Sequence, residues 1–383
     1  MTIILAPDSF KESLSAVDAA KAMKTGILQV APHAETITLP VADGGEGTVR
    51  ALVTATGGTL KNAEVSGPLG EAVSAEYGVF ADGTTAVIEM AAASGLSLVP
   101  PQKRNPLVTT TYGTGELIKK AIEQGVNDII IGIGGSATND GGAGMAQALG
   151  VVFADHHGRT IESPMCGAVL GLAAELDTSA CDALLSGVSI HVACDVTNPL
   201  LGDNGAAAVY APQKGADTKI QAELETNMRR FIDLVEARYD RKIRDIPGAG
   251  AAGGLGAGLL AFCHAELSPG IDLILDAIGF DDYLPHADLV ITGEGQIDGQ
   301  SVHGKTIMGV LRRCNKANIP VLALAGTIGD NAEKLYEYGL TGMFSICTGP
   351  MSMDKALTNA SELLTFACRN VMAVWKAGMI TSG

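Results

Sequence analysis

The stretch Thr2-Ile3-Ile4-Leu5-Ala6-Pro7-Asp8-Ser9 decides the fold class, because it joins a short apolar run directly to a polar loop. Apolar runs of this length, bounded by polar or turn residues, are typical of buried strands in parallel sheets. A helical pattern follows from Ser15, and a second strand pattern covers residues 36–39. The order strand, helix, strand predicts a βαβ unit at the N-terminus.

Strand and helix patterns alternate again near the C-terminus. Strand patterns cover residues 289–292, 321–324 and 343–346, and helical patterns cover 304–315 and 330–338. We expect these three strands and the two N-terminal ones to form one Rossmann-like parallel sheet.

The middle of the chain has a different pattern. Residues 65–90 alternate apolar and polar side chains around the turn signals Gly67-Pro68-Leu69-Gly70 and Asp82-Gly83, which is typical of antiparallel hairpins. Two further apolar runs, at 129–132 and 190–193, each lead into a glycine-rich or polar loop. The middle therefore predicts a mixed α/β domain.

These patterns together predict two domains, in agreement with a length of 383 residues. We expect a discontinuous Rossmann-like domain made of residues 1–66 and 288–383. A second mixed α/β domain at 67–287 is expected to be inserted into it, with the active site in the cleft between the two.

The charge balance limits the partners. The chain has 26 Lys and Arg against 42 Asp and Glu, a formal net charge of −16. Such a surface repels nucleic acid and anionic lipid, so we expect neither nucleic acid nor a membrane as a partner. A nucleotide site in this chain must supply local cations, backbone N–H groups or a bound metal.

Composition also indicates the compartment. The seven cysteines are scattered singly, which is not the spacing of a zinc or redox motif. Met1 leads directly into the first strand pattern, without a secretory signal, and no apolar run reaches transmembrane length. We expect a cytoplasmic protein with reduced cysteines.

Five polar loops follow predicted strands, and three of them, at 43–48, 134–142 and 292–298, contain glycine. The other two cover residues 8–13 and 195–198. Ligands of parallel α/β sheets bind beyond the carboxyl ends of the strands. Backbone N–H groups there hold phosphate oxygens, carboxylates hold Mg²⁺, and one carboxylate can accept a hydroxyl proton. The alternative is that Asp and Ser in these loops only cap the following helices.

Two stretches spell known phosphate motifs but lack their context. Residues 299–306 match a P-loop, yet 293–298 intervene after the preceding strand, so only Lys305 stays a phosphate-binding candidate. Residues 248–253 match the dinucleotide fingerprint, yet Asp245-Ile246-Pro247 is a poor central strand. We expect a tight glycine turn or close helix packing there.

The loops carry a family resemblance: the chain closely resembles the type-1 glycerate kinases of bacterial glycerate and sugar-acid catabolism. The matching stretches are 6–14, 42–48, 88–95, 134–138, 193–196, 212–216 and 291–295. The resemblance implies transfer of the ATP γ-phosphoryl group to D-glycerate with Mg²⁺, at the 2-hydroxyl, giving 2-phosphoglycerate and ADP. The family commonly has Arg-Ile-Asp-Ser after Gly295, whereas this chain has Gln296, Ile297, Asp298 and Gly299.

Roles for individual residues are hypotheses. Asp195, at a strand end, is expected to be the general base that deprotonates the glycerate hydroxyl, and Lys11 the second catalytic residue. The expected substrate-binding residues are Ser9, Phe10, Arg104 and Asn198. The expected nucleotide and phosphate contacts are Gly134, Gly135, Ser136, Thr138, Lys214, Thr292, Gly293, Glu294 and Lys305. The expected metal ligands are Asp8, Asp43 and Glu46.

Two other functions stay open at this stage. One is a kinase for another small hydroxy acid, and the other is a nucleotide- or ligand-binding protein without catalysis. The sequence also leaves the oligomeric state open, including a homo-oligomer.

Overall fold

Strand β1 (Thr2–Pro7) is the centre of the first of two sheets in the computed structural model, which describes residues 1–302 and 305–381. Its neighbours are β2 (Glu35–Thr38) and β11 (Leu289–Ile297), and all pairs are parallel. The sheet continues through β12 (Val321–Ile328) to β13 (Gly342–Ser345), in the order β13-β12-β11-β1-β2. The predicted parallel sheet built from both ends of the chain is confirmed.

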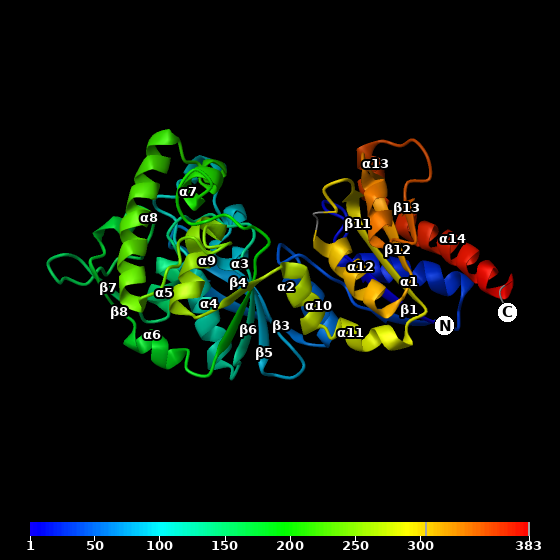
Figure 1. Cartoon of the computed structure of the whole chain (residues 1–383), viewed down its shortest axis with the longest axis horizontal. Coiled ribbons are helices and arrows are strands. Elements are labelled where there is room, and N and C mark those ends of the chain that lie inside the picture. Colours follow the sequence, from blue (N-terminus) through cyan, green and yellow to red (C-terminus); the bar gives the residue numbers. More distant parts are fainter. Residues whose placement is uncertain (303–304, 382–383) are drawn as a thin grey trace. The chain divides into compact units, whose positions relative to one another are not determined.

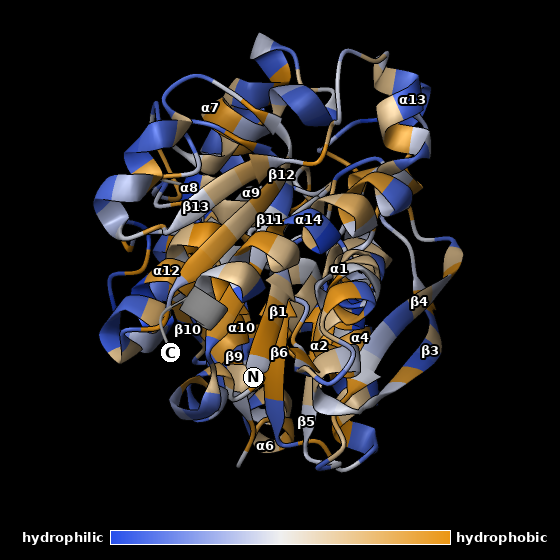
Figure 2. Ribbon diagram, turned by 90° about the vertical axis from the view of Figure 1, so that its right-hand side faces the viewer, coloured by the Kyte–Doolittle hydropathy of each residue, from blue (hydrophilic) through white to orange (hydrophobic). Residues whose placement is uncertain are grey.

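Helices cover both faces of this sheet. Consecutive residues Ile3, Ile4 and Leu5 have no exposed surface, which explains the unbroken apolar run. Helix α1 (Ala16–Val30) begins after Ser15, whose side chain accepts a hydrogen bond from the Asp18 N–H as a helix N-cap does. Figure 2 shows the central strands coloured as hydrophobic and the outer helices as mixed.

The remaining helical segments of this part of the chain lie mostly in the C-terminal third (Figure 1). The helix predicted at 330–338 is a 3₁₀ helix, and the residues that flank it, Asn331 and Gly339, are left-handed. The segments are α2 (Thr48–Thr56), α10 (Gly270–Ala277), α11 (Phe280–Tyr283), η5 (Leu284–His286), α12 (Lys305–Ala317), η6 (Ala332–Tyr338), α13 (Met353–Thr358) and α14 (Ala360–Thr381).

The second sheet is mixed, in the order β10-β9-β6-β5-β4-β3. The predicted hairpins are present, since β3 pairs with β4 and β4 with β5 in antiparallel fashion. From β5 to β10 the strands are parallel. The strands are β3 (Thr59–Ser66), β4 (Ala72–Val79), β5 (Thr85–Glu89), β6 (Asp128–Gly132), β9 (Ser189–Ala193) and β10 (Glu266–Ser268).

Helices and a small ribbon of β7 (Val152–Ala154) and β8 (Glu175–Asp177) complete this part of the chain. Its core gathers aromatic rings from three of these segments, including Phe153, Phe231 and Phe262. The helical segments are α3 (Ala91–Ser94), η1 (Leu96–Leu98), η2 (Pro101–Lys103), α4 (Tyr112–Glu123), α5 (Ala143–Ala148), η3 (Leu170–Leu172), α6 (Ser179–Leu184), α7 (Ala206–Tyr210), η4 (Pro212–Lys214), α8 (Thr218–Tyr239) and α9 (Ala251–Phe262).

The chain divides into two units. The first unit is Met1–Asp43, Arg50–Gly57 and Ile271–Gly383, and the second is Gly44–Val49 and Gly58–Gly270. These limits differ from the expected ones at 66 and 287. Strand β3 pairs along its whole length with β4, so it belongs to the second unit. Residues 271–287 belong to the first unit, where Ile271 packs on Gly309 of α12.

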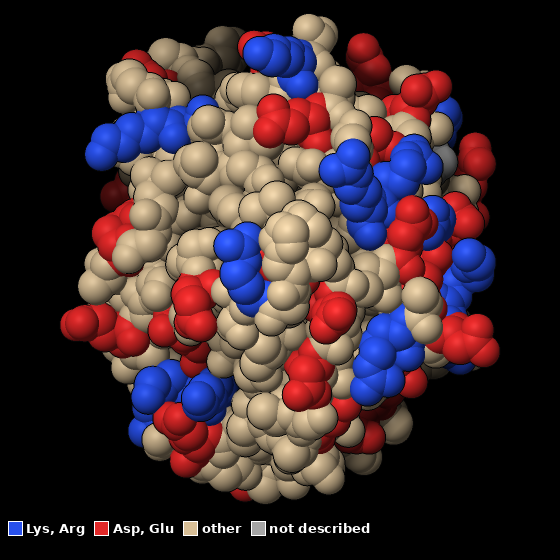
Figure 3. All heavy atoms as spheres, turned by 90° about the vertical axis from the view of Figure 1, so that its left-hand side faces the viewer, with Lys and Arg blue, Asp and Glu red and all other residues tan. Residues whose placement is uncertain are grey.

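Within the described ranges, no helix has the length and apolar character needed to cross a membrane. On the face drawn in Figure 3, acidic and basic side chains are interspersed.

Candidate active site

Asp8 follows β1 directly and is held from two sides within the first unit. The Ser9 N–H donates to Asp8 Oδ1 at 2.6 Å, and the Thr306 hydroxyl donates to Asp8 Oδ2 at 2.6 Å. Burial raises the pKa of Asp8, and the nearby negative charge of Asp43 adds to the effect. Two carboxylates that repel each other in a buried place are suited to a cation.

Glu294, near the end of β11, lies by Asp8. The Ser301 hydroxyl donates to Glu294 Oε1 at 2.9 Å. Burial raises the pKa of Glu294 to about 7; the negative charge of Asp8 also raises it, and the positive charge of Lys11 lowers it. The structure therefore brings together three of the predicted site residues, Asp8, Lys11 and Glu294.

The other predicted site residues of the first unit are described by their contacts with the rest of the chain. The Phe10 ring, expected to contact the substrate, is 2% exposed and packs in the hydrophobic core, because an aromatic ring is more stable buried than in water. Thr292 is fully buried and donates to the Ala6 carbonyl at 2.8 Å, linking β11 to β1. Gly293 lies against the Leu324 carbonyl of β12. Lys305 is the first residue of α12, and its side chain lies outside the described part.

The donors present fit a magnesium ion only in combination with a nucleotide. Within residues 1–302 and 305–381, no three His, Cys, Asp or Glu side chains are arranged to hold a metal ion. Mg²⁺ is usually held by one or two carboxylates together with substrate phosphates and waters. Asp8 and Asp43 supply two such carboxylates in the first unit, whereas Glu46 belongs to the second unit.

In the second unit, Glu89 holds the loop that contains Glu46. Glu89 ends β5, and its Oε1 accepts the Val49 N–H at 2.9 Å. Burial raises the pKa of Glu89, while hydrogen bonds from the Val49 and Gly47 backbone oppose this. Sequence reasoning gave Glu89 no role, because its bond crosses 40 residues of sequence.

The loop after β6 contains Gly134, Gly135, Ser136 and Thr138, and it rests on a buried lysine. Lys214 is 1% exposed, and its Nζ donates to Ser136 Oγ at 2.7 Å and to the Thr138 carbonyl at 2.6 Å. Burial lowers the pKa of Lys214 to about 7, and the negative charge of Asp140 opposes the shift. In this structure the ammonium contacts the loop itself.

Asp140 fixes the other end of this loop. It is fully buried and accepts hydrogen bonds from the Thr111 N–H at 2.7 Å, the Thr111 hydroxyl at 2.8 Å, and the Gly142 and Gly144 N–H groups at 3.2 and 3.3 Å. Burial raises the pKa of Asp140, and these hydrogen bonds oppose the rise. The sequence signal for this role was only its place in a glycine-rich loop.

Arg104 lies beside the turn that carries Lys214. Gly215 has φ +98°, and a Cβ there would lie 2.2 Å from the Arg104 carbonyl, so only glycine allows this approach. The Arg104 Nε is buried and has no hydrogen-bond partner among the described residues. An unpaired guanidinium nitrogen next to this loop is suited to an anion.

Asp195 and Asn198 follow β9. Asp195 Oδ1 accepts the Gly270 N–H at 2.9 Å, which fixes the carboxylate at the start of α10. The Asn198 amide accepts from the Tyr210 hydroxyl at 2.7 Å and donates to the Asn204 carbonyl at 2.8 Å. Asn198 therefore stabilises its own loop in this structure.

The glycine stretch at 248–253 packs against the loop after β6 and against the loop after β9. Gly253 has φ +70°, and a Cβ there would lie 1.9 Å from the Thr138 carbonyl. A Cβ on Gly250 would lie 2.1 Å from the Pro199 carbonyl. The predicted tight glycine turn is confirmed, and its function is close backbone packing.

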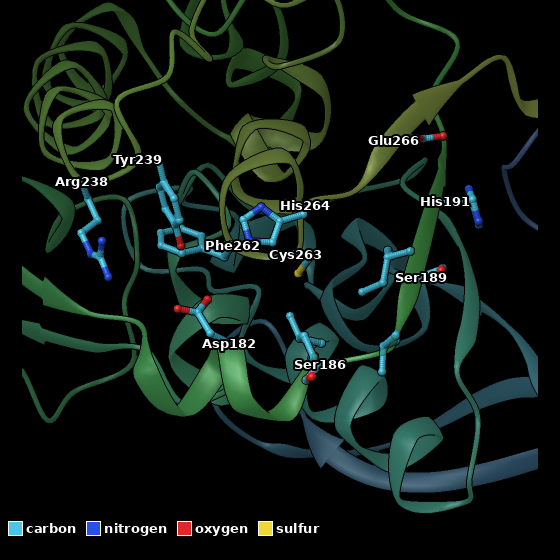
Figure 4. Close-up of a pocket in the computed structure, with 13 residues that line it drawn as sticks. Asp182, Ser186, Ser189, His191, Arg238, Tyr239, Phe262, Cys263, His264 and Glu266 are labelled. Carbon is cyan, nitrogen blue, oxygen red and sulfur yellow. The ribbon is translucent and has the colours of Figure 1, made fainter.

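A separate hollow of about 440 Å³ lies in the second unit, lined by residues from α6, α8, α9, β9 and β10. Figure 4 shows Asp182, Tyr239 and His264 around it. It contains none of the strand-end residues described above, because its β9 residues, such as Ser189, come from the amino end of the strand.

Comparisons with known proteins agree with the architecture. The model of the glycerate kinase family matches residues 3–376. A glycerate 2-kinase of Escherichia coli K12 is 48% identical over 100% of both chains, and a glycerate kinase of Bacillus subtilis 168 is 51% identical over 97% of both. A crystal structure from Salmonella typhimurium LT2, provisionally assigned as glycerate kinase 2, matches with a TM-score of 0.91 and 49% identity over 99% of both chains.

Proposed function

This chain belongs to the glycerate kinase family and is a kinase, and we propose that it transfers the γ-phosphoryl group of ATP to the 2-hydroxyl of D-glycerate. We propose the 2-hydroxyl because the chain is similar over its full length, at 48% identity, to a protein named glycerate 2-kinase. The strand-end loops support the reaction type, because they combine carboxylates, hydroxyls and lysines.

In the second unit, we propose Asp195 as the general base. Its position at the carboxyl end of β9 and its hydrogen bond from the Gly270 N–H fix one carboxylate oxygen. A fixed carboxylate within hydrogen-bond reach of a substrate hydroxyl accepts the proton as the oxygen attacks phosphorus.

In the first unit, we propose that Asp8 and Asp43 hold Mg²⁺ together with nucleotide phosphates. The ion, when bound, neutralises the charge that develops on the phosphoryl oxygens. Ser9 and Thr306 fix the Asp8 carboxylate by hydrogen bonds to its two oxygens. Lys11, whose charge acts on Glu294, adds a positive charge beside these carboxylates.

A coupled assay of ADP release tests the proposed substrate. D-glycerate, L-glycerate, D-lactate and tartrate are compared with ATP and Mg²⁺ in each case. We expect the highest kcat/KM with D-glycerate. A higher kcat/KM with another hydroxy acid would assign the chain to that substrate, and absence of turnover with every acid would favour a binding protein.

The role of Asp195 is tested by Asp195→Asn, which keeps the shape but not the basicity of the side chain. We expect kcat to fall by about 10²- to 10⁴-fold with little change in the KM for glycerate. Asp203→Asn, at an exposed position of the same loop region, is the matched control. Turnover near that of the wild type in Asp195→Asn would remove Asp195 as the base.

A further inference from the structure

The loop after β6 is built around a lysine that a ligand cannot easily reach. Lys214 is 1% exposed, and two of its three N–H donors are used on Ser136 Oγ and the Thr138 carbonyl. The buried carboxylate of Asp140, on the same loop, balances its charge. Burial of an ammonium destabilises the folded chain unless such partners are present. An ion pair at the surface would avoid this cost, so we expect a functional reason for the burial of Lys214 here.

Ser136 supplies that reason. A hydroxyl has one donor and two acceptor lone pairs, and Ser136 Oγ uses one lone pair on Lys214. Ser136 is only 8% exposed, and within the described part of the chain its O–H group has no hydrogen-bond acceptor. Two positions along, the hydroxyl of the fully buried Thr138 has no hydrogen-bond partner among the described residues.

We propose that Lys214 is a positioning residue that acts through Ser136, so that the Ser136 hydroxyl donates its proton to an anionic oxygen of a substrate. The ammonium fixes Oγ as an acceptor, which directs the O–H away from Lys214. It also polarises the hydroxyl, and hydrogen bonds assisted by charge are stronger than neutral ones. The oxygen belongs to a phosphoryl or a carboxylate group, and this inference rests on the proposed kinase reaction.

The test uses five variants of the full chain: Lys214→Met, Ser136→Ala, Ser136→Thr, the double variant Lys214→Met with Ser136→Ala, and Lys219→Met as control. Lys219 is an exposed lysine in the first turn of α8, so its change leaves the loop intact. The measurements are the KM values for ATP and D-glycerate, kcat, and the Kd values for ADP and for D-glycerate alone.

Lys214→Met and Ser136→Ala are each expected to weaken binding of the same ligand by about 10- to 100-fold, the usual effect of a hydrogen bond to a charged group. The double variant is expected to be no weaker than either single variant, because both remove one interaction. Ser136→Thr keeps the hydroxyl and should stay close to the wild type. A change in ADP affinity identifies a phosphoryl oxygen, and a change in D-glycerate affinity identifies the carboxylate.

Two results would overturn the proposal. If the losses of affinity in the two single variants multiplied in the double variant, Lys214 and Ser136 would act separately. Wild-type constants in Ser136→Ala would mean that the hydroxyl contacts no substrate, and this outcome decides the matter even if Lys214→Met fails to fold. If the wild type binds ADP but does not phosphorylate D-glycerate, the proposed function fails, and the ADP affinities still test Lys214 and Ser136.

Discussion

At the scale of residues, burial decides roles that residue type leaves open. The sequence places Lys214 and Phe10 among conspicuous polar loops, but the structure places both in the interior. It also adds Thr306, Glu89 and Asp140, whose partners are distant in sequence. Thr306, the last residue of the stretch 299–306 that spells a P-loop, donates a hydrogen bond to Asp8.

Lys214 should give the chain an unusual dependence of stability on pH. Its pKa is about 7 in the folded chain against a usual value of 10.5. Between these two values the folded chain has released a proton that the unfolded chain still binds, so the free energy of unfolding rises with pH. Each unit of pKa difference corresponds to about 1.4 kcal/mol, so the total effect amounts to several kcal/mol.

Urea unfolding of the wild type and Lys214→Met between pH 6.5 and 10 measures this effect. We expect the stability of the wild type, relative to the variant, to increase with pH across this range. The positioning role predicts the opposite trend for activity, because it needs the ammonium form. Stability curves that stay parallel would contradict the buried position of Lys214.

At the scale of elements, periodicity predicts strands well and backbone packing poorly. The order of the first sheet follows from the apolar runs, because strands with both faces covered have no alternation. The hairpins β3-β4-β5 follow from their turn signals. The glycine turn in α9 is different, since its three consecutive left-handed residues, 252–254, serve contacts with Thr138 and Gly141 that no local pattern indicates.

Gly253→Ala tests this packing. A methyl group at 253 would lie 1.9 Å from the Thr138 carbonyl at φ +70°, so we expect a loss of about 3 kcal/mol or more from overpacking and backbone strain together. Gly158→Ala is the matched control, because Gly158 has φ +72° but no atom within 4 Å of the added methyl. The control should lose only about 1 kcal/mol. Equal losses in thermal or urea unfolding would show that the contact with Thr138 is unimportant.

At the scale of the whole molecule, the sequence predicted the class of both sheets and the discontinuous path of the chain. The limits of the units were less predictable. Most of strand β3 was expected in the Rossmann-like domain, but it pairs with β4. Ile271 was expected in the inserted domain, but it packs on Gly309 of α12. The family resemblance predicted from the loops agrees with the family match over residues 3–376.

The most direct test of the central claim is to identify the product. The purified chain is incubated with ATP, Mg²⁺ and D-glycerate, and the products are followed by ³¹P nuclear magnetic resonance against authentic 2- and 3-phosphoglycerate. We expect ADP and 2-phosphoglycerate in equal amounts. Formation of 3-phosphoglycerate, or no phosphorylated glycerate at all, would contradict the proposed function.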